Sequence, residues 1–362
     1  RNPGALGCAI KLEAITGMYL DFMVSERRIP FLGLLIGILA LLGMPLQAQS
    51  SDLVATFDDA FGTEMRAPQT FEAIYENGFE QRIAELADGS KGRIGVAAVD
   101  LATGDRIAVL GDQLFPMAST SKIAVAATYL DMVERGKFSL TSEWPLMIPI
   151  RSAKFSSPAA PVRKGKYMQA IDLIEIMITR SSNPATDALL AAVGGPDKVT
   201  EWVHRQGIGE FSIDRDIATL VRDDGEHDPA SWIDPRDAAT PKAMVGLLQG
   251  LYRGDFLSDT HRQVLLGAMS RTVTGRRRIV ANMPDEAMVS HKTGSLNNTS
   301  SDIGIIEYPD GRAIAVAIYV TGQGSRLARE RRIAAIARAL YDGFEAKARL
   351  RRDDGVNWTI AP

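Results

Sequence analysis

The spacing of hydrophobic residues divides the chain into three zones. Between Arg93 and Leu110, apolar and polar positions alternate around the turn signal Ala102-Thr103-Gly104-Asp105, which predicts a strand hairpin. From Ser119 to about Ser270, apolar residues recur every three or four positions, which predicts helices. From Met288 to Thr321 the pattern again predicts strands, with a turn at Pro309-Asp310-Gly311. An amphipathic pattern from about Leu327 to Ala346 predicts a long closing helix.

Four predicted helices of the middle zone end at a glycine or serine: Gly136, Ser181, Gly194 and Gly254. The predicted fold class is α/β of the α+β type. An antiparallel sheet is formed from both chain ends and packed with terminal helices, and an all-helical lobe is inserted. We place the sheet lobe at about 70–118 and 285–350 and the helical lobe at about 119–284. We expect the site in the cleft between the lobes.

Residues 1–48 are predicted to be an upstream extension followed by a signal peptide. Two arginines precede an apolar run from Ile29 to Leu46, and Gln47-Ala48-Gln49 supplies a small-residue cleavage site. Cleavage after Ala48 leaves one exported domain, residues 49–362, in the periplasm or the medium. The eighteen-residue run is also near the lower length for a membrane span, so an uncleaved anchor is the alternative.

Composition excludes several function classes. With 46% hydrophobic and 23% charged residues and a net charge of −3, the chain is globular and lacks the basic footprint of a nucleic-acid partner. It holds one cysteine, Cys8, and four histidines without the spacing of a helical zinc site. A disulfide framework and a zinc module are therefore excluded, and no metal site is expected.

Ser119 and Lys122 are candidates for nucleophilic catalysis. Ser119 stands at the start of a predicted helix, and Lys122 follows one turn later, which brings its amine beside the hydroxyl. A lysine with a lowered pKa can take the serine proton, and N–H groups at a helix start favour an oxyanion. Such acyl transfer needs neither metal nor nucleotide, so no cofactor is expected. Alone, the pattern also fits a helix cap and a solvated lysine.

Two further polar groups lie at suitable places. Ser181-Ser182-Asn183 stands at a turn between predicted helices, where it can face Ser119, although alone it also fits a helix cap. His291-Lys292-Thr293-Gly294-Ser295 lies on a predicted strand. Its lysine and threonine can hold a carboxylate, and its glycine permits close approach of a ligand. Alone, this segment also fits a charged edge strand.

The three groups in this order are much rarer than any one of them. S-x-x-K, S-x-N and K-T-G resemble the signature of penicillin-recognising serine enzymes. Phe115-Pro116-Met117-Ala118-Ser119-Thr120 and the segment from Ala191 to Val199 resemble class A β-lactamases in particular. The similarity extends from about Gly92 to Leu340.

The resemblance implies a role for each residue. Ser119 is the acylated nucleophile, Lys122 its proton partner, and Ser181 the relay of a proton to the lactam nitrogen. The residues it assigns to substrate binding are Asn183, which contacts the substrate amide, and Lys292, Thr293, Gly294 and Ser295, which serve the carboxylate and the oxyanion. The expected partner is a small-molecule β-lactam, bound by a monomer.

One residue of the family pattern is missing. Class A enzymes use a loop glutamate, within Glu-x-x-x-Asn, to activate the deacylating water, but Ile217 stands at that place. Arg215 and Asp237 resemble the ion pair that closes the neck of this loop. The acidic residues that could replace the glutamate are Asp216, Asp223, Asp224, Glu226 and Asp228. Of these we take Glu226 as the candidate base.

Three hypotheses follow. The leading one is an exported serine β-lactamase, in which water hydrolyses an acyl-enzyme on Ser119. The alternative is a penicillin-binding or D-alanyl-D-alanine peptidase-like enzyme that acts on cell-wall peptide and deacylates slowly because the loop glutamate is missing. The third, a non-catalytic module that senses β-lactam or muropeptide, is disfavoured because the reactive residues are intact.

Overall fold

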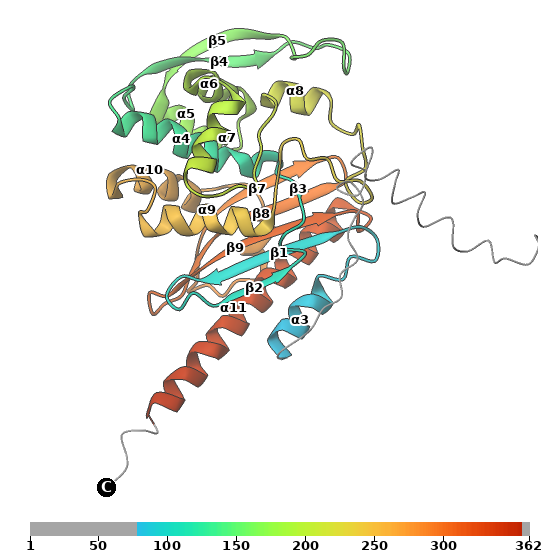
Figure 1. Cartoon of the computed structure of the whole chain (residues 1–362), viewed down its shortest axis with the longest axis vertical. Coiled ribbons are helices and arrows are strands. Elements are labelled where there is room, and N and C mark those ends of the chain that lie inside the picture. The colour runs from blue at the N-terminus through green and yellow to red at the C-terminus, as the bar shows by residue number, and fades with distance from the viewer. Residues whose placement is uncertain (1–77, 357–362) are drawn as a thin grey trace, which may run out of the picture. The chain divides into compact units, whose positions relative to one another are not determined.

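The structure, a computed structural model, describes residues 78–356; the predicted leader, residues 1–48, lies outside them. Its largest sheet is antiparallel, with strand order β2-β1-β9-β8-β7. The strands are β1 (Ile94–Asp100), β2 (Arg106–Val109), β7 (Met288–Leu296), β8 (Thr299–Glu307) and β9 (Ala313–Thr321). Because β1 pairs with β9 along its whole length, both ends of the described chain share one sheet, as predicted (Figure 1).

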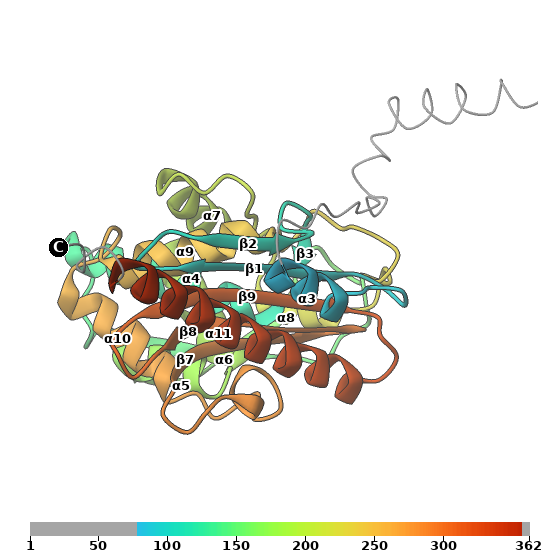
Figure 2. The same cartoon turned by 90° about the horizontal axis from the view of Figure 1, so that it is seen from below.

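Both faces of this sheet are covered by helices. Ala97 and Val99 of β1 belong to the core on the side of the inserted lobe, whereas Ile94 and Val96 belong to a second core on the opposite side. The second core is closed by the terminal helices α3 (Gly78–Leu86) and α11 (Arg326–Val356), which lie beside each other across the sheet (Figure 2). A strand covered on both faces is buried at every position, so β1 runs without charged residues from Ile94 to Val99 and does not alternate as predicted.

The inserted lobe holds most of the helices. They are α4 (Lys122–Glu134), α5 (Ala170–Thr179), α6 (Asn183–Val193), α7 (Pro196–Arg205), α8 (Ile217–Arg222), α9 (Pro241–Arg253) and α10 (Asp259–Ser270). The glycine stop signals are confirmed at α6 and α9. Gly194 and Gly254 follow them with φ of +104° and +83°, in the left-handed region that glycine adopts without steric cost.

The lobe is not all-helical, which corrects that part of the prediction. Strands β4 (Glu143–Pro149) and β5 (Val162–Gln169) form a two-stranded sheet within it. A two-residue pairing joins β3 (Phe115–Pro116) to β6 (Ala238–Ala239). The pattern did not reveal β4 and β5 because they pair only with each other and β5 is largely exposed, so neither carries the alternation of a strand with one buried face.

Helix α11 runs to Val356, beyond the predicted end near Ala346. Within residues 78–356, no helix has the length and apolar character needed to cross a membrane.

Candidate active site

The turn that carries Ser119 is fixed against the sheet by its neighbours. Ser119 lies in η1 (Ala118–Ser121), a 3-10 turn that leads directly into α4. The hydroxyl of the buried Thr120 lies 3.1 Å from the Tyr319 hydroxyl of β9. Ala118 has a φ of +50°, and backbone strain of this kind concentrates where a fold holds a reactive group. Ser119 is half-buried, and its hydroxyl forms no hydrogen bond within the described residues.

Lys122 is fully buried beside the second motif. Its Nζ donates to Asn183 Oδ1 at 2.6 Å, to the Ser181 carbonyl at 2.8 Å and to Ser181 Oγ at 3.2 Å. Burial, reinforced by the charge of Lys292, holds the pKa of Lys122 well below its ordinary value. The amine is therefore able to accept a proton at a pH where an exposed lysine cannot.

Ser181 connects the two lysines of the site. Besides its bond from Lys122, its Oγ accepts a hydrogen bond from Lys292 Nζ at 3.0 Å. With both lone pairs engaged, the Ser181 hydroxyl proton is left to donate elsewhere. Its backbone has a φ of +58°, and Ser182 follows as the cap of α6, with Oγ accepting from the Ala185 amide.

Strand β7 presents Lys292 and Thr293 beside this hydroxyl. Burial lowers the pKa of Lys292 to about 7, while Asp302 opposes and Arg278 adds to that shift. A bound carboxylate would raise the pKa again, because it supplies the negative charge that the ammonium lacks. Thr293 Oγ1 lies 2.7 Å from Thr274 Oγ1, which holds the threonine in place.

Gly294 allows β7 to approach the nucleophile turn. A Cβ at this position would lie 2.4 Å from Ser301 Oγ and 2.7 Å from the Met117 carbonyl. Contacts this short do not occur, so any side chain here would push the strand away from the turn that carries Ser119.

Arg278 is a buried cation that the sequence analysis did not single out. It donates to the carbonyls of Gly294 and Ser301 at 2.8 and 2.7 Å and to Ser295 Oγ at 2.7 Å. It also pairs with Glu330 of α11 at 3.2 Å. Arg278 thus orients Ser295 from behind the strand and adds positive potential to the carboxylate site. No spacing rule marks it, because its partners lie on β7, β8 and α11.

The loop after Arg215 is closed at its neck by an ion pair. Arg215 Nε lies 2.6 Å from Asp237 Oδ2, and Asp237 Oδ1 accepts the amides of Asp214 and Arg215 at 2.9 and 3.1 Å. The Asp237 carbonyl in turn accepts the Met117 amide at 3.0 Å. The neck of the loop therefore supports the segment that leads into Ser119.

We expect Asp237→Ala to destabilise the fold by about 3 kcal/mol, because it leaves the partly buried Arg215 and two partly buried amides without their acceptor. Urea unfolding measures the change. Arg236→Ala is the matched control, because it removes two ion pairs, with Glu226 and Asp234, that are partly exposed and worth at most about 1 kcal/mol each. Equal losses in the two variants would contradict a supporting role for the neck.

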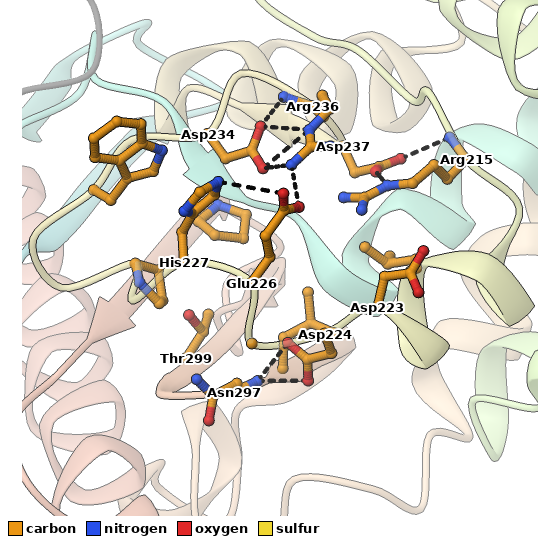
Figure 3. Close-up of a pocket in the computed structure, with 16 residues that line it drawn as sticks. Arg215, Asp223, Asp224, Glu226, His227, Asp234, Arg236, Asp237, Asn297 and Thr299 are labelled. Atoms are coloured by element: carbon orange, nitrogen blue, oxygen red, sulfur yellow. Dashed lines mark hydrogen bonds and ion pairs between the residues drawn. The ribbon is translucent and has the colours of Figure 1, made fainter. Parts of the chain in front are cut away.

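Glu226 lies in a different pocket, between the loop and the end of β7. Its carboxylate pairs with Arg236 at 2.7 Å, and Arg236 also pairs with Asp234 at 2.6 Å (Figure 3). Neither Ser119 nor Lys122 lines this pocket, whose volume is about 60 Å³. Glu226, His227 and Asp234 bring atoms together that could ligate a metal ion. Arg236 already pairs with both carboxylates, so its guanidinium supplies the positive charge there.

The sequence and the fold both match known proteins. A family model described as "Beta-lactamase enzyme family" matches residues 78–344. The chain is 33% identical over 273 residues to β-lactamase CTX-M-8 of Citrobacter amalonaticus, a match that covers 74% of this chain and 90% of that protein. A variant of the last common ancestor of Gram-negative bacteria β-lactamase class A superposes with a TM-score of 0.64 at 34% identity, over 75% of this chain and 100% of that one.

The chain belongs to the class A β-lactamase family. β-Lactamase SME-1 of Serratia marcescens is 30% identical over 67% of the chain and 80% of its own length. A solved β-lactamase from Chitinophaga pinensis covers 74% of this chain and 99% of its own, with a TM-score of 0.65 and 28% identity. These relatives favour the β-lactamase hypothesis over the penicillin-binding alternative.

The acidic loop residues of this β-lactamase all have partners other than Lys122. Two of them have partners within the loop: Asp216 accepts a hydrogen bond from the Thr219 amide, and Asp223 pairs with Arg222. Two others have partners at the end of β7: Asp224 accepts from the Asn297 amide, and Asp228 accepts from Asn298 Nδ2. Ile217, at the place of the family glutamate, is buried. The predicted candidates are therefore bound within the loop or to the end of β7.

A buried acid outside the loop acts on the charge of Lys122. Asp187 of α6 stands one helical turn after Asn183, on the same face, and its charge acts on Lys122. The spacing of four from Asn183 was the available signal. Asp187 was not among the predicted bases because it lies outside the loop.

Proposed function

We propose that the protein opens the lactam ring through an acyl-enzyme on Ser119. Lys122 takes the Ser119 proton while Oγ bonds to the lactam carbonyl carbon. Ser181, between the two lysines, donates a proton to the leaving nitrogen, and Lys122 restores it. Water then breaks the ester and releases the opened acid. The observation that carries the proposal is the Ser181 hydroxyl, which accepts from Lys122 and Lys292 and keeps its own proton to donate.

The remaining residues hold the substrate in this proposal. Lys292 and Thr293 bind its carboxylate by charge and hydrogen bond, and Asn183 contacts its amide side chain. The amides of Ser119 and Ser295 hold the oxyanion, a contribution of about 3–4 kcal/mol for each donor. Gly294 allows the two amides to lie close together.

Export belongs to the same proposal. The apolar run and small-residue site that end at Ala48 support cleavage there and export from the cytoplasm.

Intact-protein mass with benzylpenicillin tests the function. We expect residues 49–362 to consume many equivalents, with the mass rising by one acyl group and returning to its free value. A persistent one-equivalent adduct on Ser119 would instead support the penicillin-binding alternative. Absence of both adduct and turnover would overturn acyl transfer altogether.

A further inference from the structure

Asp187 is a buried acid whose position is fixed by the loop. Its Oδ1 accepts the Ile217 amide at 2.7 Å and its Oδ2 accepts the Ala218 amide at 2.9 Å. It therefore binds the backbone at the place where the family carries a glutamate side chain. Each carboxylate oxygen keeps a further lone pair beyond these two bonds.

Asp187 lines a cavity of about 320 Å³ that lies between α6 and the loop. Asn183, which accepts a hydrogen bond from Lys122, lines this cavity together with Asp187. The loop side is formed by apolar residues such as Ile217 and Val221, and Asp187 is the only acidic residue among the described residues that line it. Its carboxylate is therefore the acid that shares this cavity with Asn183, and its charge acts on Lys122.

The charged groups around Asp187 come from three elements. Lys122 faces it from α4, Asp216 from the start of α8, and Arg151 and Arg222 line the same cavity. Burial raises the pKa of Asp187 to about 7, and the Asp216 charge adds to this, while the two amides and Lys122 oppose it. Asp187 consequently changes charge in the neutral pH range.

We propose that Asp187 is a positioning residue that acts through Lys122, in place of a carboxylate on the loop, so that Lys122 serves as the base in both half-reactions. The inference rests on the proposed function. In deacylation, the water oxygen bonds to the acyl carbon as its proton passes to Lys122 Nζ. The bond between the acyl carbon and Ser119 Oγ then breaks, and Lys122 returns the proton to Oγ. Between these events the ammonium lies near ionised Asp187, which lowers the cost of burying it.

Asp187→Asn tests the inference, because it keeps the shape of the side chain and removes the charge. We expect kcat for benzylpenicillin to fall at least about tenfold at pH 7.5. In the wild-type protein, kcat should fall as the pH drops through about 7, where Asp187 takes up a proton. In the variant this limb should be lost, because residue 187 no longer takes up a proton. The limb that remains should lie at lower pH, because Lys122 loses the neighbouring negative charge and its pKa falls further.

Two comparisons separate a role in charge from a role in folding. Asp131→Asn removes another buried helix acid, one paired with Arg135, and should change neither kcat nor the acid limb. Asp216→Asn keeps a capping residue on α8 but removes a charge that raises the pKa of Asp187. It should therefore move the acid limb to lower pH, and this test remains valid if Asp187→Asn does not fold.

Several results would overturn the inference while leaving the proposed function intact. One is a wild-type protein that turns over benzylpenicillin and an Asp187→Asn variant with the same kcat at pH 7.5 and the same fall of kcat at acid pH. An unchanged acid limb in Asp216→Asn is a second. Loss of the limb in Glu226→Gln but not in Asp187→Asn is a third, and it would assign the base to Glu226. If the wild-type protein forms no adduct with benzylpenicillin, the proposed function itself fails.

Discussion

Replacing Ser119 by alanine is expected to abolish the covalent adduct with benzylpenicillin and to lower kcat/KM by at least about 10⁴-fold. The hydroxyl supplies the bond to the acyl carbon, and the other two hydroxyls of η1, on Thr120 and Ser121, are buried and donate to backbone carbonyls. Intact-protein mass and lactam absorbance measure the two effects. Since the Ser119 hydroxyl forms no hydrogen bond within residues 78–356, the variant should retain the unfolding midpoint of the wild-type protein.

Ser121→Ala is the matched control for this result. It removes a second hydroxyl from the same turn, one that donates to the Ala118 carbonyl at 2.8 Å. This variant should still form the adduct and turn over. Full turnover by Ser119→Ala, or loss of the adduct only in Ser121→Ala, would place the nucleophile elsewhere.

Replacing Lys122 by methionine should slow acylation by about 10²–10⁴-fold, because the site loses the group that takes the serine proton. Burial holds the pKa of Lys122 well below its ordinary value, so in the wild-type protein the amine loses its proton as pH rises from the acid side and acylation accelerates. The variant should lack this contribution to the pH dependence. The rate of adduct formation, followed by mass from pH 5 to 9, measures both effects.

Lys137→Met serves as the control for the loss of a lysine. Lys137 is exposed just beyond α4, and its replacement should leave acylation unchanged. If Lys122→Met acylated as fast as Lys137→Met at every pH, another base would have to be assigned.

The adjacency of the three motifs could be predicted from the sequence. Each motif lies on an element that local pattern identifies: the start of a helix, a turn between helices and a strand. Their order matches one family, so the family fixes how those elements meet. Lys122, Ser181 and Lys292 accordingly meet within 3.2 Å although they are spread over more than half of the described chain.

Other features depend on partners that no local pattern identifies. Asp187 resembles any polar residue of an amphipathic helix until Ile217 and Ala218, thirty residues later, fold over it. Arg278 is likewise buried only because β7, β8 and α11 converge on it. For such residues the sequence shows the chemical group but not its surroundings, and the surroundings determine its pKa.

The pairing of β1 with β9 has a consequence for how the chain folds. Ala97 lies opposite Ala317, whereas the nearest local partner of β1 is the short β2. The central sheet, and the second core beneath it, therefore cannot close until more than two hundred residues after β1 have been synthesised. Such long-range pairing delays folding, since a large loop must close before its contacts form. A ribosome-bound chain that ends before β9 is accordingly expected to keep β1 accessible to chaperones and proteases.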